Sequence, residues 1–149
     1  MKKTILTILL CGITILFLTG CGSKIGKTSD IEITNDDVSI TIKDDTLTNT
    51  GATFVLENNS NQTLGYGEPY HLEIKDDDSW HILNTINDAV FIMPLYHLNP
   101  NESIELKIDW ENFYGVLEPG EYRLIKDACF VVDDETSDNF YIGVEFIIE

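Results

Sequence analysis

The feature that most constrains this chain is a strict alternation of apolar and polar residues, which begins at Val38 and recurs to the end of the sequence. Such alternation is typical of strands with one face on a core and the other in water. Turn-forming stretches such as "NNSNQT", "DDDS" and "EPGE" separate the runs. Only "WENFYG" could form a single helical turn, ended by Gly115. The pattern predicts an all-β protein, an antiparallel sandwich of about seven strands.

A shorter motif refines this prediction. "VLEPGEYRLI" places Pro119 and Gly120 in a tight turn and Tyr122 at the start of a strand. This is the arrangement of a tyrosine corner, in which the phenol hydroxyl bonds back to the preceding connection. A generic Pro-Gly hairpin with a core tyrosine is the alternative. With the first interpretation, residues 121–132 and 140–148 are the last two long strands of a Greek-key sandwich.

Longer stretches carry a family resemblance. "GATFVLENNS", "YGEPYHLE", "DWENFYGVLEPGEYR" and "VEFII" resemble a bacterial immunoglobulin-like domain found on cell-envelope lipoproteins. The resemblance spans residues 38–149 and is lost in "NTINDAVFIMPLYH", so the structure of residues 84–98 stays open. It implies an immunoglobulin-like β-sandwich at the cell envelope, with no enzymatic role.

The N-terminus predicts the location. Met1-Lys2-Lys3 precedes an apolar run that ends in Leu18-Thr19-Gly20-Cys21, which resembles a bacterial lipobox. In lipoproteins the cysteine is lipidated and the chain is cut before it. The sequence therefore predicts a signal peptide over 1–20, a lipidated Cys21 with a polar tether over 21–37, and the sandwich domain over 38–149. The alternative is an uncleaved anchor helix, although the run is shorter than the roughly 20 residues that span a bilayer. Either interpretation puts the domain outside the cytoplasm, at the bacterial cell membrane.

Charge and cysteine content narrow the function. The chain has 26 acidic and 9 basic residues, a net charge of −17, which argues against nucleic acid and against docking of the surface itself on anionic lipid. Cys11 and Cys21 belong to the N-terminal segment, so Cys129 has no disulfide partner and is expected to be a buried apolar residue. We expect a monomer. No nucleophile, zinc-protease or phosphate-loop motif is present, and we expect neither an enzyme nor a cofactor.

One group of residues could bind a metal. If the loop between the strands at "HLEIK" and "SWHIL" is Asp76–Asp78, Ile74 pairs with Trp80 and Leu72 with Ile82. That register puts three potential zinc ligands on the outward face: His71, Glu73 and His81. A solvated sheet face is the alternative. The acidic loops lack the spacing and the glycine of a calcium-binding loop.

Two aromatic-rich stretches are candidates for contact with a partner protein, because exposed apolar side chains mark interaction sites. The candidate residues are Phe91, Leu95, Tyr96, Phe113 and Tyr114. Alternatively, residues 91–95 fill the core of a short edge strand broken at Pro94. The function that the sequence favours is a lipid-anchored, non-catalytic module that binds an unidentified protein. The alternative is an envelope receptor for an ion or small ligand, which would bind at the three-residue metal candidate or at an acidic loop.

Overall fold

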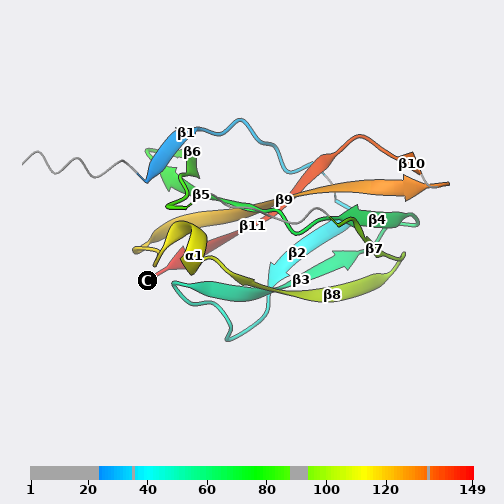
Figure 1. Cartoon of the computed structure of the whole chain (residues 1–149), viewed down its shortest axis with the longest axis horizontal. Coiled ribbons are helices and arrows are strands. Elements are labelled where there is room, and N and C mark those ends of the chain that lie inside the picture. The colour runs from blue at the N-terminus through cyan, green and yellow to red at the C-terminus, as the bar shows by residue number, and fades with distance from the viewer. Residues whose placement is uncertain (1–23, 35, 88–93, 134) are drawn as a thin grey trace, which may run out of the picture.

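The computed structural model describes residues 24–34, 36–87, 94–133 and 135–149. They form two antiparallel β-sheets packed face to face, with one short helix (Figure 1). The prediction of an all-β antiparallel sandwich is confirmed. Within the described residues, no helix is long and apolar enough to cross a membrane.

The smaller sheet has three strands in the order β2-β3-β8, and the larger has eight. The strands of the smaller sheet are β2 (Val38–Ile42), β3 (Gly51–Asn58) and β8 (Glu102–Asp109). Those of the larger sheet are β1 (Ile25–Thr28), β4 (Thr63–Tyr66), β5 (His71–Asp76), β6 (Ser79–Leu83), β7 (Tyr96–Leu98), β9 (Gly120–Val132), β10 (Glu135–Thr136) and β11 (Phe140–Ile148). Seven of these strands have five or more residues, which is the number that the alternation predicts. The four shorter strands lack enough alternating positions to be recognised from sequence.

Strand β9 is the centre of the larger sheet. One of its edges pairs with β5 and then β4, and the other pairs with β11 and then β10. At its start the Tyr122 hydroxyl donates a hydrogen bond to the Glu118 carbonyl oxygen at 2.9 Å, which is the hydrogen bond of a tyrosine corner. The Tyr122 ring stacks on Phe146, which stacks on the fully buried Trp110. This aromatic stack joins the two sheets without a disulfide.

The predicted register of the β5–β6 hairpin is wrong by one residue. Asp76 pairs with Ser79 and Ile74 pairs with His81, so the loop is the two residues Asp77 and Asp78. Both have positive φ, 45° and 63°, as the twist of a two-residue hairpin requires. Aspartate is one of the few residues other than glycine that adopts this conformation readily, and a two-residue loop was therefore available to "DDD".

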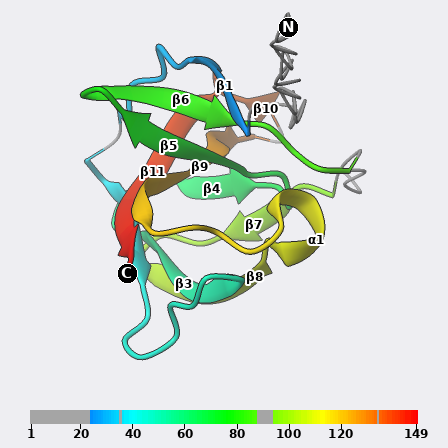
Figure 2. The ribbon, with the colours of Figure 1, turned by 90° about the vertical axis from the view of Figure 1, so that its left-hand side faces the viewer.

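The polar segment over residues 21–37 is predicted to be a tether, but part of it belongs to the fold. Ile25–Thr28 form β1, which pairs with β6 at the edge of the larger sheet. Residues 29–34, here called the N-terminal strap, then cross the outer face of that sheet (Figure 2). The Ser29 amide donates to the Trp80 carbonyl oxygen at 2.8 Å, and the Thr34 amide to that of Tyr141 at 3.4 Å. Backbone pairing with an existing edge needs no apolar alternation, which explains why the sequence pattern misses β1.

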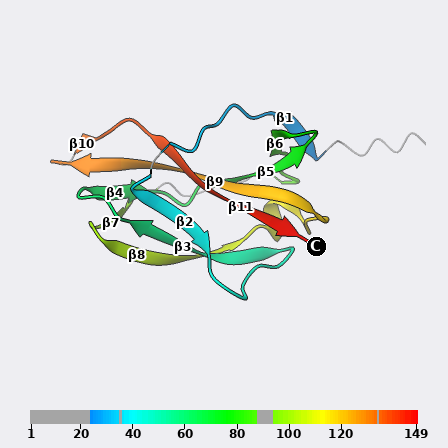
Figure 3. The ribbon, with the colours of Figure 1, turned by 180° about the vertical axis from the view of Figure 1, so that it is seen from behind.

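The sandwich is closed along one side and open along the other. On the closed side β2 lies against β11 (Figure 3). On the other side, strand β8 is the edge of the smaller sheet, and helix α1 (Glu111–Tyr114) follows it directly. This single turn ends at Gly115, whose φ of 72° favours glycine, as "WENFYG" predicts.

Candidate functional site

A groove of about 510 Å³ opens between the two sheets along the β8 side. Its volume lies in the range of natural ligand pockets. The residues that line it come from the end of β4, the β4–β5 connection, β7, β8, α1 and β9. They are Tyr66, Gly67, Glu68, Tyr70, Tyr96, Ile104, Glu105, Leu106, Lys107, Ile108, Asp109, Phe113 and Lys126.

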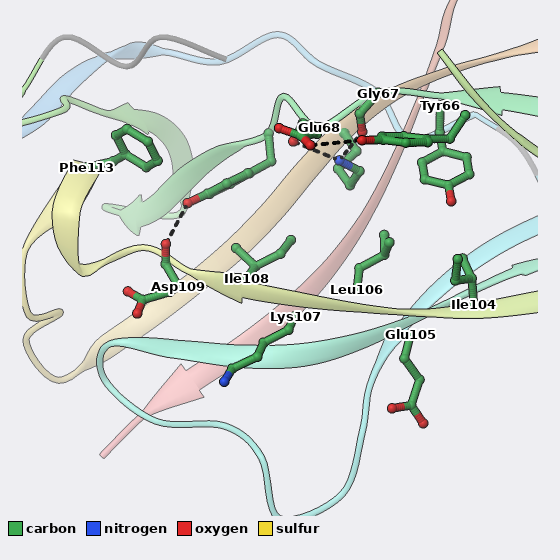
Figure 4. A pocket seen from close by; sticks show the side chains of 13 residues that line it. Tyr66, Gly67, Glu68, Ile104, Glu105, Leu106, Lys107, Ile108, Asp109 and Phe113 are labelled. Carbon is green, nitrogen blue, oxygen red and sulfur yellow. Dashed lines mark hydrogen bonds between the residues drawn. The ribbon is translucent and has the colours of Figure 1, made fainter. Parts of the chain in front are cut away.

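Strand β8 supplies the floor of the groove. Ile104, Leu106 and Ile108 project from it into the groove, whereas the Glu105 and Lys107 side chains point to the opposite face (Figure 4). Ile108 is buried, Leu106 is half-buried, and Ile104 is 38% exposed. The apolar face of β8 therefore becomes progressively more exposed toward the start of the strand.

Tyrosines form most of the roof. Tyr66 and Tyr96 lie with ring centroids 5.6 Å apart, and the Tyr96 hydroxyl donates to Glu68 Oε1 at 2.9 Å. This hydrogen bond raises the pKa of the Tyr96 hydroxyl. The Tyr70 hydroxyl donates to the Asp109 carbonyl oxygen at 3.4 Å, and burial raises its pKa above the ordinary value. The roof thus presents aromatic faces, hydroxyls and one carboxylate above an aliphatic floor.

A buried lysine holds this roof in place. Lys126, on β9, is 2% exposed, and its Nζ donates to the carbonyl oxygens of Gly67, Glu68 and Pro69 at 2.9, 3.2 and 3.0 Å. Burial lowers the pKa of this amine to about 8, although the carboxylates of Asp127 and Glu68 oppose the shift. The sequence analysis missed this residue. Alternation could have found it, because Lys126 shares the inward face of β9 with Tyr122, Leu124 and Ala128.

The structure does not bring the three metal candidates together. Ile74 takes the place opposite His81, so His81 lies on the opposite face of the hairpin from His71 and Glu73. His81 Nδ1 lies 3.4 Å from the Gly26 carbonyl oxygen, whereas His71 Nε2 lies 3.1 Å from Glu73 Oε1. Across the described ranges, no group of three or more His, Cys, Asp or Glu side chains could hold a metal ion.

Glu73 belongs instead to a buried ion pair beneath the N-terminal strap. It is fully buried and accepts from Arg123 Nε at 2.5 Å and from Ser29 Oγ at 2.6 Å. The Arg123 guanidinium also donates to the Ile31 carbonyl oxygen at 3.3 Å and lies 4.7 Å from the Trp80 ring centroid. The sequence predicts a solvated position for Glu73 because nothing in the alternation shows that the strap covers the outward face.

The model of a family described as "Bacterial Ig-like domain" matches residues 34–141. The chain belongs to this bacterial Ig-like domain family. The match covers most of the sandwich, from the end of the strap into β11. No curated protein matches the chain. Domains of this family are typically not enzymes, and membership of the family suggests a non-catalytic module.

The Ig-like domain exposes only some of the predicted contact residues. Leu95 and Tyr96 are 48% and 39% exposed, and Phe113 is half-buried at the end of the groove. Tyr114 is buried, and its hydroxyl accepts a hydrogen bond from the Leu72 amide at 3.3 Å, so it is not a surface contact. Phe91 lies outside the described residues. The sequence missed Ile104, because alternation assigns it to the inward face without showing that this end of the face is open.

Cys129 has the character of a core residue in the Ig-like domain. It is buried, its Sγ lies 3.8 Å from the Gly65 carbonyl oxygen, and burial raises the pKa of its thiol. A raised pKa keeps the sulfur protonated and unreactive at neutral pH. The groove, lined by tyrosines and by the aliphatic residues of β8, is suited to binding through apolar and aromatic contact.

Proposed function

We propose that this chain is a lipid-anchored, extracytoplasmic module that binds another protein through the groove between its sheets. The observation that carries the proposal is the apolar floor of β8, which rises out of the core to Ile104 beneath a roof of tyrosines. Aromatic side chains with accessible hydroxyls are enriched where proteins bind one another.

The anchor part of the proposal is supported by the resemblance of Leu18–Cys21 to a lipobox. Strand β1 begins at Ile25, only four residues after Cys21. Four residues span at most about 14 Å, so a lipid on Cys21 would hold the β1–β6 edge close to the bilayer surface.

Metabolic labelling with an alkyne-bearing fatty acid in a bacterial host tests the anchor. We expect the wild type and Cys11→Ala to incorporate the label and to sediment with membranes. Cys21→Ala is expected to lose the label. Equal labelling of Cys21→Ala and the wild type would contradict lipidation at Cys21.

Photo-crosslinking in cells tests the binding site. A photoreactive side chain at Ile104 would sit on the groove floor, and one at Thr41 would sit on the exposed face of β2, the opposite edge of the smaller sheet. The proposal predicts a specific adduct from Ile104 and none from Thr41. Equal or absent capture at the two positions would show that the groove does not bind a partner.

A further inference from the structure

Strand β8 presents a long unpaired edge beside the groove. Among the described residues it pairs with β3 alone, without interruption from Glu102 to Asp109. The Trp110 amide donates to the Thr50 carbonyl oxygen at 2.9 Å. Because hydrogen-bonded and non-hydrogen-bonded pairs alternate along an antiparallel ladder, the even-numbered residues of β8 are the ones that bond to β3. It follows that Ser103, Glu105, Lys107 and Asp109 direct their amides and carbonyls away from β3. The Tyr70 hydroxyl, which reaches the Asp109 carbonyl oxygen from that side, agrees with this assignment.

The other sheet edges in the described part of the chain are short or covered. β1 and β7, at the ends of the larger sheet, have four and three residues, and β2 and β11 lie against each other. Natural proteins protect long edges with proline, bulges or covering segments, because an unpaired edge is a template for another strand. Strand β8 has eight residues, no proline and no bulge.

We propose that an extended segment of the partner protein adds to the free edge of β8 as a new strand, with alternate apolar side chains entering the groove. This proposal rests on the proposed function and names the mode of binding and the chemistry of the partner. Strand addition uses the free amides and carbonyls of the edge for affinity and a lateral pocket for side-chain selectivity. Both features occur together only here in the described structure: the edge groups of Ser103, Glu105 and Lys107, and the groove floored by Ile104 and Leu106.

The charges beside the edge of β8 indicate which side chains the partner segment carries outside the groove. Residues alternate across a strand, so those of the partner that do not enter the groove would lie beside the outward side chains of β8. Asp109 and Glu105 are acidic there, with Glu105 already paired to Lys43 Nζ at 2.7 Å, and Glu68 and Glu102 lie at the roof and at the start of the strand. Lys107 is the one outward amine on β8. The partner segment is therefore expected to alternate apolar with basic residues. A second copy of this chain fits less well, because each copy carries a net charge of −17.

The test removes one edge donor and leaves the groove and the β3 ladder intact. In Lys107→Pro the lost amide is one that points to the free edge, where proline is tolerated. Lys107→Ala is the matched control, because it removes the same side chain and keeps the amide. Each change is made in the full-length chain that carries the photoreactive side chain at position 104, and capture is measured in cells. A protease-resistance assay shows whether Lys107→Pro is folded. If it is not, Glu105→Pro with Glu105→Ala repeats the test at the next edge amide.

Strand addition predicts that the proline variant loses capture at least tenfold while the alanine variant keeps it. Mass spectrometry should then find the crosslink in a segment that alternates apolar and basic residues. Equal capture by the proline variant and the wild type would overturn strand addition and leave the proposed function standing. Crosslinking to a segment of this same chain would overturn the assignment to a basic partner and indicate a dimer. If the wild type shows no adduct at position 104, the proposed function fails together with this inference.

Discussion

At the scale of single residues, Lys126 shows how a buried charge can shape a surface groove. Its amine donates three hydrogen bonds, one to each carbonyl oxygen of residues 67–69. These hydrogen bonds fix the β4–β5 connection, which carries part of the groove roof. The cost is desolvation of a charged group, which is visible in its pKa of about 8.

This lowered pKa makes a prediction about pH. Between pH 8 and 10.5 the unfolded chain holds more protons at Lys126 than the folded chain does, so Lys126 adds to the free energy of unfolding as pH rises. The stability of the wild type relative to Lys126→Met should increase by on the order of 1–2 kcal/mol from pH 8 to 10. Urea unfolding of both proteins at several pH values checks this. The tyrosines titrate in both proteins, so their contribution cancels in the difference between the two free energies of unfolding. A difference that stays constant with pH would contradict it.

The ion pair beneath the strap makes a second residue-level prediction. Arg123→Met leaves the Glu73 carboxylate buried without its charged partner, which should lower the free energy of unfolding by about 3–5 kcal/mol. Adding Glu73→Leu removes the orphaned charge and should restore most of that loss. Lys75→Met, which breaks an exposed ion pair with Glu121, is the control and should leave the free energy of unfolding nearly unchanged. Chemical denaturation measures all three, and a double variant no more stable than Arg123→Met would disprove the account.

At the scale of elements, the alternation of apolar and polar residues was enough to predict a strand that has one face on the core and the other in water. Residues 121–132 and 140–148 are predicted as strands, and β9 and β11 occupy residues 120–132 and 140–148. The register of the β5–β6 hairpin was not predictable in this way, because Ile74 can face the core with either a two-residue or a three-residue loop. Turn chemistry decides between the two, and aspartate suits both.

The observed turn can be tested directly. Asp78 has a φ of 63°, and glycine adopts this conformation without the steric cost of a Cβ. Asp78→Gly should therefore stabilise the protein by roughly 0.5 kcal/mol, despite the added freedom of the unfolded chain. Asp76→Gly is the control, because Asp76 is a strand residue paired with Ser79 and should lose stability. Thermal melting of both variants measures the effect, and destabilisation by Asp78→Gly would argue for a different loop.

At the scale of the whole molecule, the strap changes where the folding unit begins. A chain starting at Val38, the boundary that the alternation predicts, would lack β1 and the cover over Glu73 and Arg123. We expect it to be less stable than a chain starting at Lys24 by about 3 kcal/mol or more, because the backbone pairing of β1 with β6 and the hydrogen bonds of the strap to Glu73 and Arg123 would be lost. Urea unfolding compares the two, and equal midpoints would mean that the strap contributes nothing.

The candidate site was less predictable than the fold. Tyr96 and Phe113 line the groove and lie in aromatic-rich stretches that stand out in the sequence, whereas Leu95 is exposed but does not line the groove. Ile104, Leu106 and the free edge of β8 were not predicted as part of the site, because their exposure depends on how the larger sheet is placed over β8. The alternation shows which face of a strand a side chain occupies, but it does not show whether another sheet or segment covers that face.

The position of β1 also determines how the domain carries load. A pull on the residues before Ile25 reaches the sandwich through the β1–β6 pairing and then through the contacts of Ser29 with Glu73 and Trp80. The larger sheet would therefore separate first at its β1 edge, whereas β8, which forms the floor of the groove, belongs to the smaller sheet and lies away from that line of tension. With the lipid on Cys21 that we propose, β1 can detach under load while β8 keeps its register with β3.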